Sequence, residues 1–440
     1  MVGMGVGLIL FGAAVPAVAE KPAGEWDLSA EVGLEARVFA NKPDHPGQSG
    51  NTFSPSLFIA PEIIYEWNGG DDRATLKPFL RLDRDDDNRS HFDIREANWL
   101  HLGDGHDLVV GIDKVFWGVA ESRHLVDVIN QDDRVEDLDG EDKLGQPMIQ
   151  MAVSRDWGTL TGFVLPGFRE RSFPSDDARL RGALPIAGDD ATYDAGREDR
   201  AIDIAVRYTQ VFGDVDFGIS HFHGTSREPR LSVVAGATGP ELRPHYDRID
   251  QTGVDVQYTA DAWLWKLEAI GRGGHGSYFG AAVAGVEYTL YQIRESDADL
   301  GLLAEYLYDG RDENGDAPLT AFENDVFFGA RLTLNDPEDT TLLAGAIIDV
   351  GDRSTLATLE ASRRIGADWK VEIEARALID IAPSDVLSGV RKDDFVTFRL
   401  TRFFECSRGT SSDPPEARNP RVDACRDSHR RPSSSGRYVR

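Results

Sequence analysis

The chain has 440 residues, which is enough for two or three ordinary domains or for one large β-barrel. Aspartate and glutamate outnumber lysine and arginine by 76 to 47, so the formal net charge is −29. This acidic balance argues against a nucleic-acid partner, because neutralising phosphates requires clustered cations.

The first nineteen residues follow the pattern of a secretory signal peptide. Val6 to Val15 form a short apolar run, and Pro16-Ala17-Val18-Ala19 supplies a small-residue cleavage site before Glu20. We therefore expect residues 1–19 to direct Sec-dependent export, although no Lys or Arg precedes Lys21. A buried N-terminal segment is the alternative interpretation.

The rest of the chain has no apolar stretch that could cross a membrane as a helix. None approaches the roughly 20 residues that such a helix needs. A membrane protein with this sequence must therefore be a closed barrel, because lipid cannot satisfy an open sheet edge. The body, residues 20–404, also lacks cysteine, so no disulfide framework stabilises it.

Within residues 20–404, segments of about ten residues alternate between apolar and polar side chains, which is typical of β-strands. In Trp26 to Phe39, for example, Leu34 and Val38 share one face, while Glu35 and Arg37 share the other. Sixteen strands remain an alternative to eighteen, because the strand boundaries within 147–165 and 246–271 are weakly marked. Arg230 to Ala235 is a candidate for a hairpin within a loop. We predict about eighteen strands, near 27–39, 56–67, 74–84, 91–101, 106–116, 147–154, 158–165, 199–211, 214–223, 246–259, 262–271, 279–291, 298–308, 323–334, 340–349, 353–364, 369–380 and 392–404.

Short and long connections alternate along the chain. The short ones include 68–73, 103–105 and 155–157, and the long ones include 40–55, 117–146, 166–198, 224–245 and 309–322. A soluble sandwich has no reason to show this asymmetry. It predicts an all-β fold: a transmembrane antiparallel up-and-down β-barrel with short periplasmic turns and long extracellular loops.

Charged residues occur at the inward positions of the predicted strands. Charge on the lipid side is costly, so these residues should line water. A barrel of sixteen to eighteen strands is wide enough for an aqueous channel. We expect the basic side of the pore lining to comprise Arg81, Arg95, Arg207, Arg331, Arg376 and Arg399.

The connection 117–146 is rich in acids and resembles the inward-folded third loop of general porins. The resemblance implies a constriction in which the loop acids face Arg81 or Arg95 and favour cations. The alternative is a solvated acidic loop that binds divalent ions at the lipopolysaccharide surface. The acidic side of the constriction would comprise Asp127, Asp132, Asp133, Glu136 and Asp137.

Two further segments resemble outer-membrane proteins. Gly111 to Gly118, with Asp127 and Asn130 beyond it, is similar to a pattern in proteobacterial porin-like and exporter-like barrels. The segment 394–404 resembles the C-terminal strand of outer-membrane barrels, which implies that the barrel-assembly machinery and periplasmic chaperones recognise it. Its assembly signal would comprise Phe398, Leu400 and Phe404.

Residues 405–440 are rich in Pro, Ser and Arg and do not alternate, so we predict a disordered basic tail. One hypothesis is a read-through or frameshift product without a function of its own. The alternative is a periplasmic extension closed by a Cys406–Cys425 disulfide.

Together these features predict a passive porin-like channel for small polar solutes in the outer membrane of a Gram-negative bacterium. Lipid and lipopolysaccharide would surround it, and a homotrimer is an open alternative to a single barrel. No cofactor, metal or catalytic residue is implied; His221 and His223 could ligate a metal with His245, but we expect them to point outward in the rim. The competing functions are a substrate-specific uptake or export barrel, an outer-membrane enzyme with a plugged lumen, and a non-transporting barrel.

Overall fold

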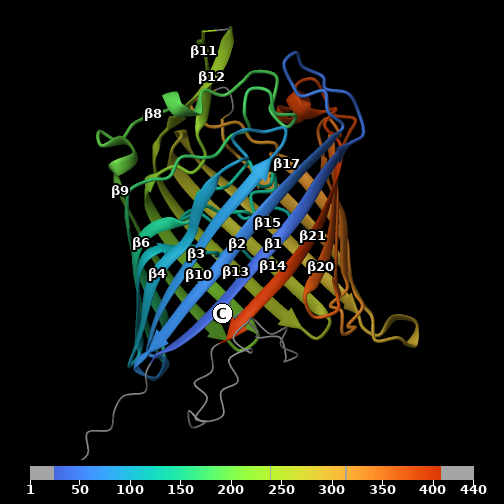
Figure 1. Cartoon of the computed structure of the whole chain (residues 1–440). Helices are drawn as coiled ribbons and strands as arrows, with labels where there is room; N and C mark the ends of the chain where they lie inside the picture. Colours follow the sequence, from blue (N-terminus) through green and yellow to red (C-terminus); the bar gives the residue numbers. More distant parts are fainter. Residues whose placement is uncertain (1–23, 238, 313–314, 408–440) are drawn as a thin grey trace, which may run out of the picture.

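The computed structural model describes residues 24–237, 239–312 and 315–407, so the predicted signal peptide and residues 408–440 lie outside the described residues. Within them, eighteen antiparallel strands follow one another around a closed barrel (Figure 1). β1 pairs with both β2 and β21, which closes the sheet. The strands are β1 (Glu25–Phe39), β2 (Phe53–Trp67), β3 (Asp72–Asp83), β4 (Phe92–Gly103), β5 (His106–Asp113), β6 (Gln146–Arg155), β7 (Gly158–Pro166), β9 (Ile202–Phe212), β10 (Val215–Thr225), β13 (Arg248–Ala260), β14 (Trp263–Gly274), β15 (Gly276–Leu290), β16 (Asp299–Asp309), β17 (Asn324–Thr333), β18 (Thr341–Asp349), β19 (Thr355–Ile365), β20 (Trp369–Ile379) and β21 (Phe395–Ser407).

The predicted barrel of eighteen strands is confirmed, and the two weakly bounded segments each form two strands, β6 with β7 and β13 with β14. The last strand is longer than predicted. β21 continues through Ser407, where it still pairs with Asp27 of β1. The barrel therefore extends beyond Phe404, the expected boundary.

A second, three-stranded sheet belongs to the loops. Its strands are β8 (Thr192–Tyr193), β11 (Arg230–Ala235) and β12 (Pro240–Tyr246), so residues 230–235 form the expected loop hairpin. This sheet lies above the rim at the end of the barrel that carries the long loops (Figure 1). Short 3-10 helices complete the described elements: η1 (Asn68–Gly70), η2 (Gly188–Asp190), η3 (Glu198–Arg200), η4 (Ile293–Glu295) and η5 (Val386–Val390). Among the described residues, no helix is long and apolar enough to cross a membrane.

The alternating pattern places charged side chains inside the barrel and apolar ones outside. On β1, Leu34 is 61% exposed, whereas its neighbour Glu35 is 3% exposed. The register pairs Leu34 with Leu400 and Glu35 with Arg399 of β21. Because successive side chains of a strand point to opposite faces, this register directs Leu34 and Leu400 to the outer surface and Glu35 and Arg399 to the lumen. Tryptophan and tyrosine gather near the short turns, with Trp26 against Tyr65 and Trp263 against Tyr288, each at 4.5 Å between ring centroids. Such amphipathic rings favour a membrane–water boundary.

The buried apolar core lies inside the barrel. It joins inward side chains of β6 to β18 to residues of the long connection between β5 and β6, which we call the lumen loop (residues 114–145). The sequence pattern predicted a lumen lined by charge, but this part of the inner wall is apolar. The apolar wall gives the loop a surface on which it can bury its own apolar side chains.

Candidate functional site

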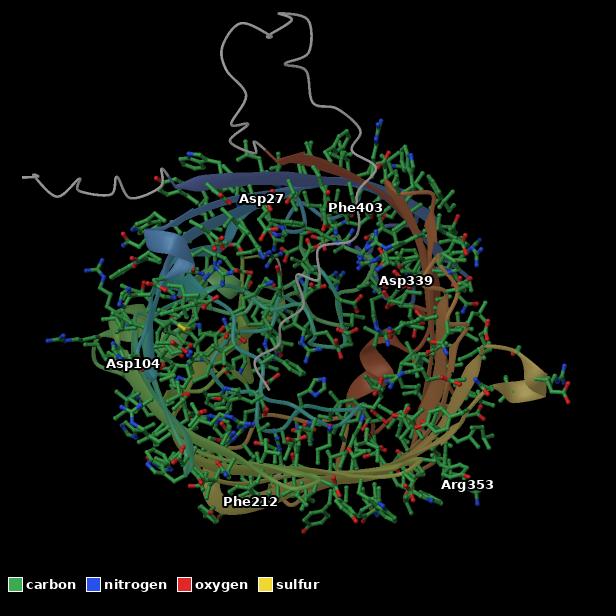
Figure 2. All side chains as sticks on the ribbon, turned by 90° about the horizontal axis from the view of Figure 1, so that it is seen from below. Asp27, Asp104, Phe212, Asp339, Arg353 and Phe403 are labelled. Carbon is green, nitrogen blue, oxygen red and sulfur yellow. The ribbon has the colours of Figure 1, made fainter. Side chains whose placement is uncertain are left out.

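The lumen loop runs within the ring of strands, as the view from the short-turn end shows (Figure 2). Val126 and Ile129 are 0% and 1% exposed. Trp117 packs edge-on against Phe163 of β7, with ring centroids 5.6 Å apart, and the Arg207 guanidinium lies 5.0 Å from the Trp117 ring. Burial of an apolar side chain such as Val126 or Ile129 contributes about 1.5–3 kcal/mol, so apolar packing holds the lumen loop against this wall.

Two wall carboxylates also bind the backbone of the lumen loop. Glu268 of β14 accepts hydrogen bonds from the N–H groups of Val119 at 2.7 Å and Ala120 at 2.9 Å. Glu305 of β16 accepts hydrogen bonds from the N–H groups of Glu121 and Ser122, both at 2.8 Å. Both carboxylates are buried. They satisfy consecutive loop amides that would otherwise lose their water partners, and so they fix residues 119–122 against the wall.

The same loop binds a group of arginines on the opposite part of the barrel. The Arg81 Nη2 lies 2.6 Å from Glu136 Oε2, and Arg37 Nη2 donates to the Glu136 carbonyl at 2.6 Å. Arg89 donates to the Val135 carbonyl at 2.8 Å. Since these arginines belong to β1, to β3 and to the loop after β3, the lumen loop connects two separate parts of the wall.

A single glutamate organises these arginines. Glu35 of β1 lies 2.6 Å from Arg89, 2.9 Å from Arg399 and 3.3 Å from Arg81. We call Glu35 with Arg37, Arg81, Arg89 and Arg399 the arginine cluster. Sequence analysis did not single out Glu35 or Arg89 as site residues. The inward parity of Glu35 on β1 was a signal, but no pattern placed Arg89 beside it, because Arg89 lies in a loop.

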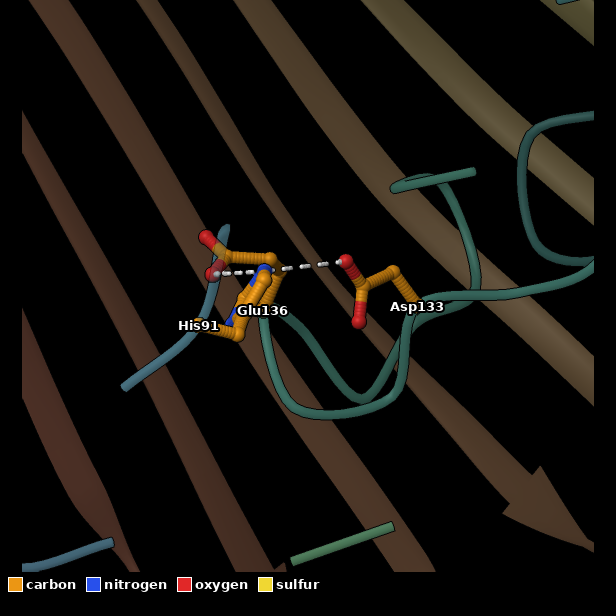
Figure 3. A group of neighbouring side chains, drawn as sticks. All are labelled: His91, Asp133 and Glu136. Carbon is orange, nitrogen blue, oxygen red and sulfur yellow. Dashed lines mark ion pairs between the residues drawn. The ribbon is translucent and has the colours of Figure 1, made fainter. Parts of the chain in front are cut away.

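Three of the five predicted acids contact predicted arginines directly instead of facing them across a gap. Besides the Glu136–Arg81 pair, Asp133 lies 2.7 Å from Arg95 and Asp137 lies 3.7 Å from Arg376. Figure 3 shows Asp133 and Glu136 side by side on the loop, next to His91. Direct pairing neutralises the opposite charges locally, so these pairs do not form the separated rows of charge that the resemblance implied.

Two of the predicted acids have other roles. Asp127 accepts a hydrogen bond from the Trp117 N–H at 2.6 Å and so ties two parts of the loop together. Asp132 pairs with Lys143 at 2.6 Å and with Arg171 at 3.0 Å.

The remaining predicted arginines divide between the two sides of the lumen. Arg207 of β9 pairs with Asp255 at 2.7 Å and lies next to the Trp117 ring of the lumen loop. Arg331 of β17 pairs with Glu121 of the loop at 2.5 Å, and Arg376 of β20 pairs with Asp139 at 2.7 Å. Arg331 therefore binds the lumen loop, and Arg399 belongs to the arginine cluster. Both side chains remain partly exposed.

Residues expected on the outside of the barrel are there. Phe398, Leu400 and Phe404 are all exposed on β21, and their role as an assembly signal stays a prediction. His221 and His223 are also exposed, and His223 pairs with Asp250 of β13 at 2.8 Å. His245 instead pairs with Asp194 and Asp247.

Acidic pH should strengthen the docking of the lumen loop. Burial raises the pKa of Asp127 to about 6, and burial with Glu136 and Asp137 raises the pKa of Asp142 to about 6. A raised carboxyl pKa favours the protonated, docked form. The stabilisation of the docked loop by these protonated carboxyls is therefore complete below their unperturbed pKa of about 4, and it is lost as the pH rises through about 6. Arg81 and Arg89 lower the pKa of Glu136 despite its burial. Protonation of Glu136 would weaken docking, but it occurs only at a pH below this range.

We expect a smaller and quieter current through the barrel at pH 5 than at pH 7.5. A carboxyl group that binds its proton about tenfold more tightly in the docked loop can change the ratio of docked to released loop by about tenfold. Current recordings from single barrels in planar bilayers measure this. Burial and the neighbouring Asp137 also raise the pKa of Asp139, in the same loop, to about 7. The Asp127→Asn, Asp139→Asn, Asp142→Asn variant should therefore lose most of the dependence, whereas Asp104→Asn, in a short turn, should keep it. An unchanged pH dependence in the triple variant would contradict the assignment.

The closed barrel of eighteen antiparallel strands, with an apolar outer surface and a loop bound inside its lumen, is a β-barrel of the porin-like fold. Comparison with solved structures finds the same fold in two proteins of Pseudomonas aeruginosa, OpdQ and OpdO. The OpdQ structure has a TM-score of 0.51 and 11% sequence identity over 88% of this chain and 100% of its own. The OpdO structure has a TM-score of 0.50 and 10% identity over 88% of this chain and 98% of its own. Neither a protein-family model nor a curated protein matches the sequence.

Proposed function

We propose that the protein is a passive channel for small polar solutes in the outer membrane of a Gram-negative bacterium, narrowed by the lumen loop. The observation that carries the proposal is that the loop is bound on both sides: by Glu268 and Glu305 on one part of the wall, and by the arginine cluster on the other. A barrel of eighteen strands is wide enough to conduct unless its interior is filled. A loop bound at both sides leaves a narrower passage.

We further propose that the passage follows the inner wall formed by β17 to β21 and β1. Several inward charges here retain exposed surface, whereas the buried apolar core that holds the lumen loop lies mainly on β6 to β16 and reaches only Phe327 of β17 and Ile347 of β18 beyond them. Glu360 of β19 is 47% exposed, Arg331 is 36% exposed and Lys370 is 32% exposed. Because both signs are present, the passage suits small polar solutes of either charge. In this setting the partners would be lipid, lipopolysaccharide and the assembly machinery, and a homotrimer remains a prediction.

Planar-bilayer recording tests the channel. Pure folded protein should produce discrete conductance steps, and their absence would contradict the proposal. Cysteine substitution then tests the route. In a background without Cys406 and Cys425, Glu360→Cys should react with a charged thiol reagent in water and change the current. Leu359→Cys, on the outward face of the same strand, should not respond.

A substrate-specific uptake or export barrel is the second candidate, because further loops close over the lumen loop. Arg227 donates to the Ile129 carbonyl at 2.7 Å, and Arg171 pairs with Asp132. Both arginines come from loops at the long-loop end. Block of the conductance by one solute at low concentration would favour this function over a general channel.

A further inference from the structure

A group of metal-ligating side chains lies in the loops at the long-loop end, apart from the lumen contacts described above. Asp194 follows β8, His245 belongs to β12, and Asp247 joins β12 to β13. The parallel pairing of β8 with β12 places His245 opposite Thr192 and so brings the three residues together. His245 Nε2 lies 3.2 Å from Asp194 Oδ1 and 3.5 Å from Asp247 Oδ1.

These spacings agree with ligands that share one ion. Zinc binds imidazole nitrogen and carboxylate oxygen at about 2.0–2.2 Å, so two ligands of one ion lie roughly 3–4 Å apart. The three ligand atoms all lie within 4.8 Å of one another. One imidazole with two carboxylates is a donor set that Zn²⁺ and similar divalent transition metals accept.

A neighbouring hydroxyl orients the imidazole for this role. Thr192 Oγ1 lies 2.8 Å from His245 Nδ1 and donates its proton to the Pro244 carbonyl at 3.4 Å. The Thr192 oxygen therefore accepts from the Nδ1–H, which leaves the Nε2 lone pair directed at the two carboxylates. Metal-ligating histidines are oriented in this way, through a hydrogen bond from the other ring nitrogen.

A second histidine approaches the same group from its buried side. His275, in the turn between β14 and β15, is 1% exposed, and neither of its ring nitrogens has a hydrogen-bond partner among the described residues. Its Nε2 lies 3.9 Å from Asp247 Oδ2, too far for a hydrogen bond but within the spacing of two ligands around one ion. A buried imidazole without a partner is unfavourable, and an ion beside Asp247 would satisfy it.

The other histidine–carboxylate group is less suited to a metal. His91 lies 3.7 Å from Glu136 and 3.8 Å from Asp133, but Arg81 and Arg95 already neutralise these two carboxylates (Figure 3). In the first group Arg230 donates to both oxygens of Asp247, at 2.7 and 2.8 Å, so a metal ion would share this carboxylate with Arg230. The described ion pairs of Asp194 include His245 but no arginine or lysine. One of the two carboxylates in this group is therefore paired with arginine, whereas both are in the His91 group.

We propose that Asp194, His245 and Asp247 bind a divalent transition metal of the Zn²⁺ class, with His275 beside them. The ion would join the β7–β9 loop to the start of β13 and so fix the loops over the barrel mouth. This site is separate from the passage through the lumen and does not depend on conductance.

The test is zinc binding by the full-length protein, purified in detergent without a polyhistidine tag and carrying Cys406→Ser and Cys425→Ser. Titration calorimetry with ZnCl₂ alone should show a specific site that chelator removes. Asp194→Asn and His245→Ala should abolish it, and Thr192→Val should weaken it by about tenfold, as loss of an orienting partner does. His221→Ala, on the outer wall, is the matched control and should bind like the parent.

Proteolysis gives a second readout. The exposed Arg197 and Arg200 follow Asp194, so zinc should slow tryptic cleavage after them in the parent and not in Asp194→Asn. Asp194 is exposed, so this variant should keep its fold, which heat-modifiable migration on a gel verifies. No zinc binding by the parent, or equal binding by the folded Asp194→Asn and His245→Ala variants, would overturn the proposal.

Discussion

Replacing both Glu268 and Glu305 with alanine is expected to release residues 119–122 of the lumen loop from the barrel wall. The four backbone amides of residues 119–122 and the Ser122 hydroxyl donate to these two carboxylates at 2.5–2.9 Å, and the Val126 N–H donates to Glu268 at 3.2 Å. A hydrogen bond to a charged group contributes about 1.5–3 kcal/mol. Loss of even one such bond shifts the docking equilibrium by about tenfold or more. The double variant should therefore conduct more than the parent and fluctuate more between current levels.

Amide hydrogen exchange and bilayer recording together measure this release. Protection of residues 119–122 should fall by at least about tenfold, whereas strand amides keep their protection. Glu287→Ala is the control: Glu287 lies on the intervening strand β15 and pairs with Arg331 and Lys266, without a hydrogen bond to the loop backbone in the described structure. If the double variant matched Glu287→Ala in both measurements, the wall carboxylates would not be the anchors of the loop.

The Glu35→Gln substitution should cause the largest loss of stability from a single exchange in the lumen. Glu35 is buried and is the shared partner of Arg81, Arg89 and Arg399. Glutamine has nearly the same size but no charge, so these guanidinium groups would lose their common anion. Removing one partner of a buried ion pair costs about 3–5 kcal/mol. The uncompensated cations should also shift the selectivity of the channel toward anions.

Unfolding by urea, followed by tryptophan fluorescence, measures the first effect, and the reversal potential in a salt gradient measures the second. Glu62→Gln is the matched control on β2. Its pair with Lys77, at 2.9 Å, is partly exposed, so its loss should cost less than about 1 kcal/mol. Equal stabilities of the Glu35 and Glu62 variants would show that the arginine cluster does not need its central anion.

Most of the barrel could be predicted from local sequence patterns. The alternation in β1, where Leu34 points outward and Glu35 inward, appears in the sequence because strand geometry repeats every two residues. The alternation of short turns with long loops distinguished a membrane barrel from a sandwich. The inward course of residues 117–146 was implied by resemblance, and the contacts of Glu136 and Glu121 with the wall place this loop inside the barrel.

The partners within the lumen were not predictable in the same way. Glu305 and Ser122 are nearly two hundred positions apart, and Arg89 reaches Glu35 from a loop. The sequence pattern also did not show that inward apolar residues such as Phe222 and Ile270 would form one buried core with Val126 and Ile129 of the lumen loop instead of lining water. The resemblance to general porins placed the predicted acids opposite Arg81 or Arg95 in a constriction, whereas three of these acids contact predicted arginines directly.

By itself, the sequence determined the architecture: a barrel of about eighteen strands, the alternation of side chains between its two faces, and the grouping of the long loops at one end. These properties depend on the period of a strand and on the chemistry of turns, which act over a few neighbouring residues. Only the tertiary structure decided which charges neutralise one another and which inward surfaces the lumen loop covers. Those pairings depend on the closure of the sheet and on the path of the loop, which bring together residues that no local pattern relates.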